Sequence, residues 1–372
     1  MSEDQGKRLN DYLLIEPHYG WADAEGNFIK PTLKQILKEY LTRINIFKDS
    51  KAWFPFMAWF WVLCLLPFML LLLFKYFTWP LFIGGMVYGM VIMGSHGTMW
   101  YHRYSTHNAF TFKNSFWKFV SQHIVIKVIP EELYVVSHHI HHEKSDMPGD
   151  PYNAFGGFFY CFFADTNHQL IKRDLTPEDY NIASKCLQHT GARINTYEEY
   201  LKYGTITNPW YIMISWVLNW SFWGLAFFFL GEAIGVTGGG MAMVCAVFGG
   251  TFVWSVGIRT FNYEGHGKGA GKNGWGSSDL NRKDYSINQL WPGYVAGEWH
   301  NNHHLFPTSS RSGFLPYQMD LPWMYVKFLH WIGGITEYRD NKKQFLENYY
   351  KPFKENQTIV DSSALPVDLS GR

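Results

Sequence analysis

Histidines gathered at metal-ligand spacing are the most informative feature of this sequence. Three groups have that spacing: His102-Arg-Tyr-Ser-Thr-His107, His138-His139-Ile-His141-His142 and His300-Asn-Asn-His303-His304. A fourth candidate is His266, which follows Asn262 by four residues. An H-x-x-H-H pattern arises by chance roughly 0.03 times in a chain with this histidine content, yet it occurs here twice. The sequence therefore predicts a site built from imidazole groups.

The spacing within each group indicates how the rings can meet. On an α-helix the positions i, i+3 and i+4 share one face, so each H-x-x-H-H group can direct three imidazoles at one point. His102 and His107 are five positions apart, which is about 140° around a helix, so one helical stripe cannot hold both. Their spacing fits the end of a helix. We expect all four groups to converge.

Nine imidazoles are too many for one ion with about four to six ligands, but they suit two ions that keep positions open for water or O2. The predicted metal ligands are His102, His107, His138, His141, His142, His266, His300, His303 and His304. Iron fits an imidazole-rich site with open positions and activates O2, whereas zinc has no redox chemistry. Carboxylates close in sequence are candidates for orienting these ligands, namely Glu143, Asp146, Asp150 and Glu298.

The elements that must position these histidines lie in a membrane. Charged residues make up only 17% of the chain, below the roughly 25% that is usual in soluble domains. Four segments contain no Asp, Glu, Lys or Arg: Ala52–Phe74, Tyr76–His102, Tyr203–Gly231 and Ala233–Ile258. Each exceeds the roughly 20 residues that cross about 30 Å of hydrocarbon. Buried helices of a large soluble core would seldom give four such runs, so the predicted fold is an all-α integral membrane protein with four transmembrane helices.

The placement of Lys and Arg orients these spans. Eight basic residues precede the first span, whereas the link between the first two spans contains only Lys75. By the positive-inside rule the N-terminus, the segment 103–202 and everything after Arg259 face the cytoplasm. The histidines then lie in a cytoplasmic helical cap. Net charge is +1 and gives no indication of nucleic-acid binding.

The chain is thus expected to form one membrane domain over residues 1–372. The predicted parts are a cytoplasmic N-terminal segment 1–51 with an amphipathic helix at 31–47, a hairpin of spans at 52–102, a cap segment at 103–202, a second hairpin at 203–261, a C-terminal cap segment at 262–356 and a disordered tail at 357–372. Thr176-Pro177 and Asn208-Pro209 are typical of helix starts.

At these histidines the chain resembles the membrane fatty-acid desaturase family, and within it the stearoyl-CoA, or delta-9, type. The matching elements are His102–His107, His138–His142 followed by Asp150-Pro151, Asn262–His266, and Gly297-Glu298 before His300–His304. The likeness covers roughly residues 50–335. The third histidine segment, which continues through Pro307 to Gly313, is similar to that of bacterial and plastid-like members.

The resemblance implies two iron ions, with Asn262 bound to one of them through water, and an acyl chain held in a bent apolar tunnel. It also implies an O2-dependent reaction that introduces a cis double bond, at the delta-9 position, into a long saturated acyl chain on CoA or lipid. The electrons must come from outside, from cytochrome b5 or a ferredoxin, because no His-Pro-Gly-Gly segment or ferredoxin-like cysteine set is present. The expected location is a bacterial inner membrane, or the endoplasmic reticulum of a eukaryote.

Two other classes fit part of the pattern. The same scaffold could carry a fatty-acyl hydroxylase, an alkane monooxygenase or a carotenoid ketolase. A histidine-rich metal transporter or store would place ionisable ligands inside the spans. Almost all the histidine groups lie outside the uncharged segments, which favours the enzyme.

Overall fold

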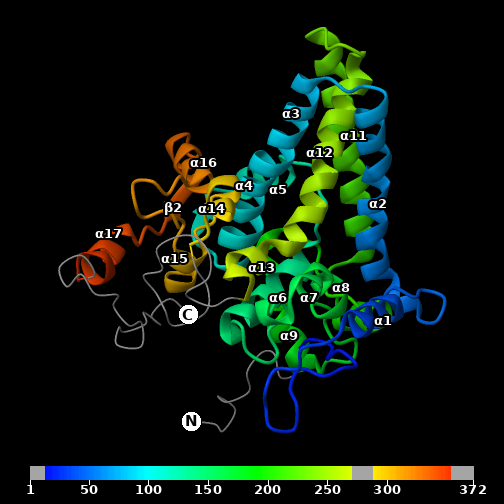
Figure 1. Ribbon diagram of the computed structural model, residues 1–372, viewed down its shortest axis with the longest axis vertical. Helices are drawn as coiled ribbons and strands as arrows, with labels where there is room; N and C mark the ends of the chain where they lie inside the picture. Colours follow the sequence, from blue (N-terminus) through cyan, green and yellow to red (C-terminus); the bar gives the residue numbers. More distant parts are fainter. Residues whose placement is uncertain (1–12, 270–287, 353–372) are drawn as a thin grey trace.

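The computed structural model describes residues 13–269 and 288–352, and four long apolar helical stretches dominate it (Figure 1). They run over Ser50–Phe74, Trp79–Thr106, Pro209–Ala233 and Gly239–Gly265. Each contains most of one uncharged segment of the sequence, so the predicted helical membrane fold with four spans is confirmed. The tail predicted to be disordered, 357–372, lies outside the described residues.

Each span is built from one or more consecutive helices. The first comprises η2 (Ser50–Ala52) and α2 (Trp53–Phe74); the second comprises α3 (Trp79–Val87), η3 (Tyr88–Met93), α4 (Gly94–Gly97) and η4 (Thr98–Thr106); the third is α11 (Pro209–Ala233); the fourth comprises α12 (Gly239–Gly257), η7 (Ile258–Thr260) and α13 (Phe261–Gly265). Both η3 and η4 are π-helices. Helix α12 packs against α2, α3 and α11 and so forms the centre of the bundle (Figure 1).

The second and fourth spans approach one another at glycines. A Cβ atom placed on Gly250 would lie 1.9 Å from the carbonyl oxygen of Gly85, and one on Gly89 would lie 2.1 Å from the carbonyl oxygen of Gly250. No side chain fits at either position. Because helices in lipid associate by packing rather than by the hydrophobic effect, this backbone contact stabilises the crossing.

Most of the remaining elements gather at the end of the spans that carries the histidines. They are α1 (Leu33–Arg43), β1 (Phe110–Phe112), α5 (Ser115–His123), α6 (Glu131–Lys144), η5 (Ala154–Gly156), α7 (Phe158–Phe162), α8 (Ala164–Asn167), α9 (Pro177–Lys185), η6 (Gln188–Thr190), α10 (Tyr197–Tyr203), η8 (Gly267–Gly269), α14 (Leu290–Ala296), α15 (His300–Leu305), α16 (Leu321–Trp331), β2 (Ile335–Tyr338), α17 (Lys342–Phe345) and η10 (Leu346–Tyr350). Strands β1 and β2 pair antiparallel, with Phe110 opposite Tyr338. This small sheet was not predicted.

The local sequence signals are largely confirmed. Thr176 and Asn208 cap α9 and α11 through their side chains, as expected of residues before Pro177 and Pro209. The amphipathic helix expected at 31–47 is shorter and spans Leu33–Arg43, where Thr32 and Gln35 form a capping box. Its Ile36 is buried against the protein, whereas Leu37 and Leu41 are exposed.

The glycine crossing gives a prediction about assembly of the bundle. Gly250→Val should destabilise the protein, because the added side chain must push two backbones apart, and overpacking typically costs about 1–3 kcal/mol. Gly84→Val is the matched control, since a Cβ at Gly84 meets nothing within 4 Å. Thermal unfolding in detergent, followed by size-exclusion chromatography, measures the difference. Equal melting temperatures for both variants would contradict the crossing.

Candidate metal centre

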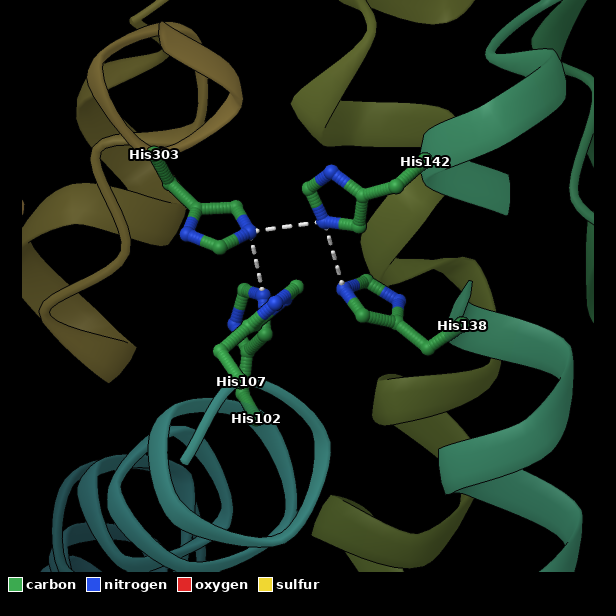
Figure 2. A group of neighbouring side chains, drawn as sticks. All are labelled: His102, His107, His138, His142 and His303. Atoms are coloured by element: carbon green, nitrogen blue, oxygen red, sulfur yellow. Dashed lines mark hydrogen bonds between the residues drawn. The ribbon is translucent and has the colours of Figure 1, made fainter. Parts of the chain in front are cut away.

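Five of the predicted histidines form one compact group, and Figure 2 shows their rings gathered together. The group contains His102, His107, His138, His142 and His303, and one ligand atom from each lies within 4.8 Å of all the others. The Nε2 atom of His303 lies 2.7 Å from that of His102 and 2.8 Å from that of His142. His138 and His142 approach to 3.1 Å through the same atoms. Three separate chain segments therefore direct imidazole nitrogens at one point.

The other four predicted histidines form a second group of the same kind. It contains His141, His266, His300 and His304, again with ligand atoms within 4.8 Å of one another. The Nε2 atom of His300 lies 2.8 Å from that of His266 and 3.1 Å from that of His304. The two groups adjoin, because the rings of His142 and His304 stack with centroids 4.5 Å apart.

Helix geometry divides the histidines between the two groups. On α6, His138 and His142 are four residues apart and share a face, while His141 on the adjacent face reaches the second group. Helix α15 divides its residues in the same way, with His303 in one group and His300 and His304 in the other. Each H-x-x-H-H segment thus contributes to both groups. This differs from the prediction that the three imidazoles of one segment point to the same place.

A π-turn brings His102 and His107 together. The backbone N–H of His107 donates to the carbonyl of His102 at 3.2 Å, which is the i→i+5 bond of a π-helix. This bond places residues five apart one above the other. An α-helix would separate these two positions by about 140°, which is why their spacing predicts a helix end. The structure has both features, since His107 is the C-terminal cap of η4.

Buried carboxylates face the Nδ1 atoms of four of these rings. Asp150 Oδ1 lies 2.9 Å from His141 Nδ1, and Asp146 Oδ2 lies 2.6 Å from His266 Nδ1. The carboxylate of Glu298 lies between the groups, 3.2 Å from Nδ1 of His102 and 3.7 Å from Nδ1 of His300. A carboxylate at Nδ1 fixes the tautomer and turns the Nε2 lone pair outward, as in many metal sites.

The fourth carboxylate that we predicted is placed differently. Glu143 is half-buried on α6 and forms no hydrogen bond or ion pair with any of the nine histidines, all of which are described. Asp146 and Asp150 reach the histidine rings because the chain turns back after α6, with Asp146 in the left-handed region at φ 56°. The backbone N–H groups of Asp146 and Tyr152 then donate to Asp150 and hold its carboxylate in place.

Burial keeps most of these imidazoles uncharged. Removal from water, and then the proximity of other rings, lowers the pKa of His107, His138, His142, His303 and His304 well below the usual value. Burial also lowers the pKa of His300 to about 3. For Glu298, burial opposes ionisation, but the His102 ring beside it lowers the pKa of the carboxyl. Neutral imidazoles and ionised carboxylates are the forms that a cation requires.

The donor set fits metal ions. Two nitrogens that bind one ion at about 2.1 Å and at right angles lie about 3.0 Å apart, close to the separations observed here. Buried Nε2 atoms of His107 and His141 have no hydrogen-bond partner, and such orphaned atoms are costly unless they meet a cation. Since all the donors are imidazole nitrogens, a transition metal suits them better than magnesium or calcium.

Beside the first group lies a predominantly apolar pocket, which residues of the spans line in large part. Its metal-side wall includes His102, Tyr134, Tyr152 and Asn262. Its span-side wall includes Ala58, Gly97, Thr98, Trp254 and Ser255. Asn262, predicted to bind metal through water, lies in this wall one turn before His266, and its carbonyl accepts the His266 N–H. No local pattern in the sequence indicates which residues line the pocket.

Arg103 is a second feature that the sequence analysis missed. Its guanidinium is buried and donates to the carbonyls of Gly297 and Ser310, and it forms an ion pair with Asp320 at 2.9 Å. These contacts hold the segment that carries Glu298 and α15 against the second span. The sequence position of Arg103 could have indicated this role, because it directly follows an uncharged segment and lies between the predicted ligands His102 and His107.

Comparison with known proteins agrees with this site. The family model for fatty acid desaturases matches residues 77–333. The delta-9 acyl-lipid desaturase 1 of Arabidopsis thaliana is 27% identical over 271 residues, which cover 70% of this chain and 76% of the relative. An acyl-CoA C20 delta5-desaturase of Anemone leveillei is 26% identical over 253 residues, covering 66% and 70%.

Four apolar spans and two buried groups of histidines that could hold metal ions define a membrane protein with a candidate metal centre. The chain belongs to the fatty acid desaturase family, as the resemblance of its histidine segments indicated. It is therefore an oxidoreductase of lipid metabolism.

The carboxylates give a prediction about metal binding. Asp150→Asn should weaken metal affinity about 10–100-fold, because the charge that orients His141 is lost. Glu143→Gln is the matched control. Glu143 is an acid on α6 that makes no contact with the ligands, so this variant should bind metal normally. Metal content per protein, measured by mass spectrometry after dialysis against graded chelator, separates the two. Equal retention by both variants would contradict the role of Asp150.

Proposed function

We propose that this protein is an O2-dependent acyl desaturase that introduces a cis double bond, at the delta-9 position, into a long saturated acyl chain. The observation that carries the proposal is the shared wall of the apolar pocket and the first histidine group: His102 belongs to both. A methylene chain in this pocket would lie directly beside the metal centre. Desaturation requires that contact, because the carbons that react carry no activating group.

In this proposal the nine histidines bind two iron ions, with Asn262 in contact through water. When bound, the irons supply the reduction of O2 to water and the removal of two hydrogens from neighbouring methylenes. The two histidine groups support two ions because each gathers four or five nitrogens. Soluble di-iron proteins use carboxylate ligands, whereas here the carboxylates lie behind the imidazoles, so the ligand sphere itself is neutral.

The protein's own residues position the acyl chain and exclude water from the site. The pocket walls beside His102 restrict the acyl chain to a narrow set of conformers, which is the entropic part of catalysis. Apolar residues from the spans exclude water, so the reactive species meets only the substrate. Two tyrosines at the metal-side wall are fixed by packing: the ring of Tyr134 stacks on His138, and the hydroxyl of Tyr152 meets that of Ser137 at 2.5 Å.

The acyl carrier is CoA or a membrane lipid, since the relatives named above include an acyl-lipid and an acyl-CoA enzyme. The electrons come from an external donor such as cytochrome b5 or a ferredoxin. We place the metal centre on the cytoplasmic side of a bacterial inner membrane or of the endoplasmic reticulum. The distribution of Lys and Arg in the sequence supports this orientation.

The reaction is tested by expressing the chain in a host that lacks its own desaturase. Gas chromatography of the fatty-acid methyl esters should detect a cis-monounsaturated acid that is absent without the protein. Analysis of the separated lipid and CoA pools identifies the carrier. His303→Ala should abolish the product, because it removes the nitrogen that lies closest to both His102 and His142.

Other outcomes distinguish the alternatives. A hydroxylated or ketonic product would contradict desaturation while leaving the metal centre intact. Tightly bound zinc without O2 consumption would instead favour a transporter or store. Recovery of the double bond at another position would correct only the regiochemistry.

Filling the pocket should block the reaction without removing metal. Ser255 is buried and lines the pocket, so Ser255→Phe is expected to lower desaturation of an 18-carbon chain about tenfold or more by excluding it from the near-attack position. Val256→Phe adds the same ring at the next position, which does not line the pocket, and should retain activity. Product yield divided by metal content is the measurement. Similar yields from both variants would place the acyl chain elsewhere.

A further inference from the structure

Three helices beside the second span present apolar faces that the described part of the chain leaves uncovered. They are α5, α14 and α16, which lie near α4 in Figure 1. Six of their exposed apolar residues, here called the apolar shelf, are Phe116, Phe119, Trp291, Met324, Phe328 and Trp331. Trp331 is 80% exposed and Phe116 is 64% exposed, as much as Leu218 at 64% on the lipid-facing surface of α11. Large apolar side chains that are this exposed on neighbouring helices indicate an interaction with lipid or protein.

The contacts of α14 fix its depth. It packs against η3 and α4, and a Cβ on Gly94 would lie 3.4 Å from the carbonyl oxygen of Val295. Gly94 follows Trp79, where the second span begins, by about 22 Å of helix at 1.5 Å per residue, and the hydrocarbon core is about 30 Å thick. If the span is tilted, the distance from Trp79 to Gly94 along the membrane normal is shorter than about 22 Å, so Gly94 still lies within the hydrocarbon. Helix α14 therefore lies level with the hydrocarbon.

Helix α16 occupies a neighbouring position. Its buried face, Val326 and Leu329, packs in one cluster with Met99 and Trp100 of the second span, and the helix also contacts α4. Its opposite face carries the exposed residues of the shelf. The ammonium group of Lys327, between the two faces, reaches the hydroxyl of Tyr338 at 2.8 Å. A lysine that bends towards a polar partner in this way is typical of helices at a membrane surface.

Helix α5 is held at similar depth by a different interaction. The chain that follows it runs between the spans without helical hydrogen bonds, and side chains of α11 satisfy its carbonyls. Trp223 Nε1 donates to His123 O at 3.0 Å, and Asn219 donates to Val125 O at 3.0 Å. Trp220 Nε1 donates to Lys127 O at 2.8 Å. Irregular backbone at membrane depth is tolerated only where protein satisfies it, and Asn219 lies about 15 Å along α11 from Pro209.

We propose that the apolar shelf is seated among the lipid acyl chains of the leaflet that surrounds the histidine-bearing ends of the spans. Its occupant is lipid, because the shelf is continuous with the second span and lies at the depth of hydrocarbon. Parts of the segments 103–202 and 262–356, which the sequence assigns to a cytoplasmic cap, then lie inside the leaflet.

The shelf also bears on the metal centre. Helix α14 leads directly into Glu298 and α15, and Asp320, which caps α16, is the partner of Arg103. The third histidine segment is therefore held between two helices that the leaflet supports. This role depends on the membrane position of the shelf and not on the proposed reaction.

The test uses nitroxide labels on the full chain, with its metal, in vesicles of phosphatidylcholine and phosphatidylglycerol. Phe119→Cys and Phe328→Cys are labelled in a background of Cys64→Ala and Cys186→Ala, which removes the two cysteines that are not buried. Electron paramagnetic resonance then compares collisions with O2, which enters hydrocarbon, and with a water-soluble nickel chelate. Leu218→Cys reports lipid, and Lys343→Cys, whose native side chain is 87% exposed, reports water.

Both shelf labels should match Leu218, with an O2-to-nickel collision ratio about tenfold above that of Lys343, because hydrocarbon excludes polar solutes. A ratio equal to that of Lys343 would place the shelf in water and overturn the proposal. Low collision rates with both reagents would show that protein, such as a second copy of the chain, covers the shelf, and would overturn it equally. Unchanged metal content in each labelled variant establishes that the fold is intact, and Trp331→Cys replaces any position that loses metal.

Discussion

The convergence of nine buried imidazoles is the interaction on which the rest of the structure depends. Their nitrogens approach one another as closely as 2.7 Å, and burial holds most of the rings in the neutral state. Buried lone pairs without partners cost about 1–3 kcal/mol each, so this arrangement is unfavourable by itself and suits cations at its centre. Binding energy of metal ions is then folding energy, since the ligands come from segments that only the folded chain brings together.

The supporting elements can be understood as means of holding those rings against their mutual repulsion. The acids Asp146, Asp150 and Glu298 lie on the far side of the rings and would offset the charge of a bound metal. Arg103 joins the second span to the segment that carries Glu298, across nearly two hundred positions of sequence. On α15 the asparagines between the histidines also contribute, because Asn302 donates to Ser312 O at 2.7 Å and anchors the helix from its other face.

The sequence was sufficient for features that composition or short spacing encodes. Uncharged length reveals the spans, and the i, i+3 and i+4 spacing reveals six of the nine histidines. His102 and His107 were identified from a spacing that fits a helix end, and His266 from its place after Asn262. It was insufficient where the chain folds back on itself. Glu143 and Asp150 are similar acids after the same motif, yet only the turn after α6 decides that Asp150 reaches His141. No local sequence pattern indicates the pairing of β1 with β2 or the π-turn at His107. The shelf helices also lack a signal, because they are too short to appear as membrane spans.

The position of the metal centre at the ends of the spans reconciles two demands that conflict elsewhere. Carboxylates and Arg103 are expensive in the middle of a bilayer, whereas a dry apolar pocket is easiest to build there. The second span satisfies both, because Gly97 and Thr98 line the pocket and His102, one turn further on, begins the histidine groups. An acyl chain can thus remain in apolar surroundings while its reacting carbons reach ions that polar residues hold. With the shelf helices seated in the leaflet, the apolar surroundings extend around the side of the metal centre and keep bulk water away from it.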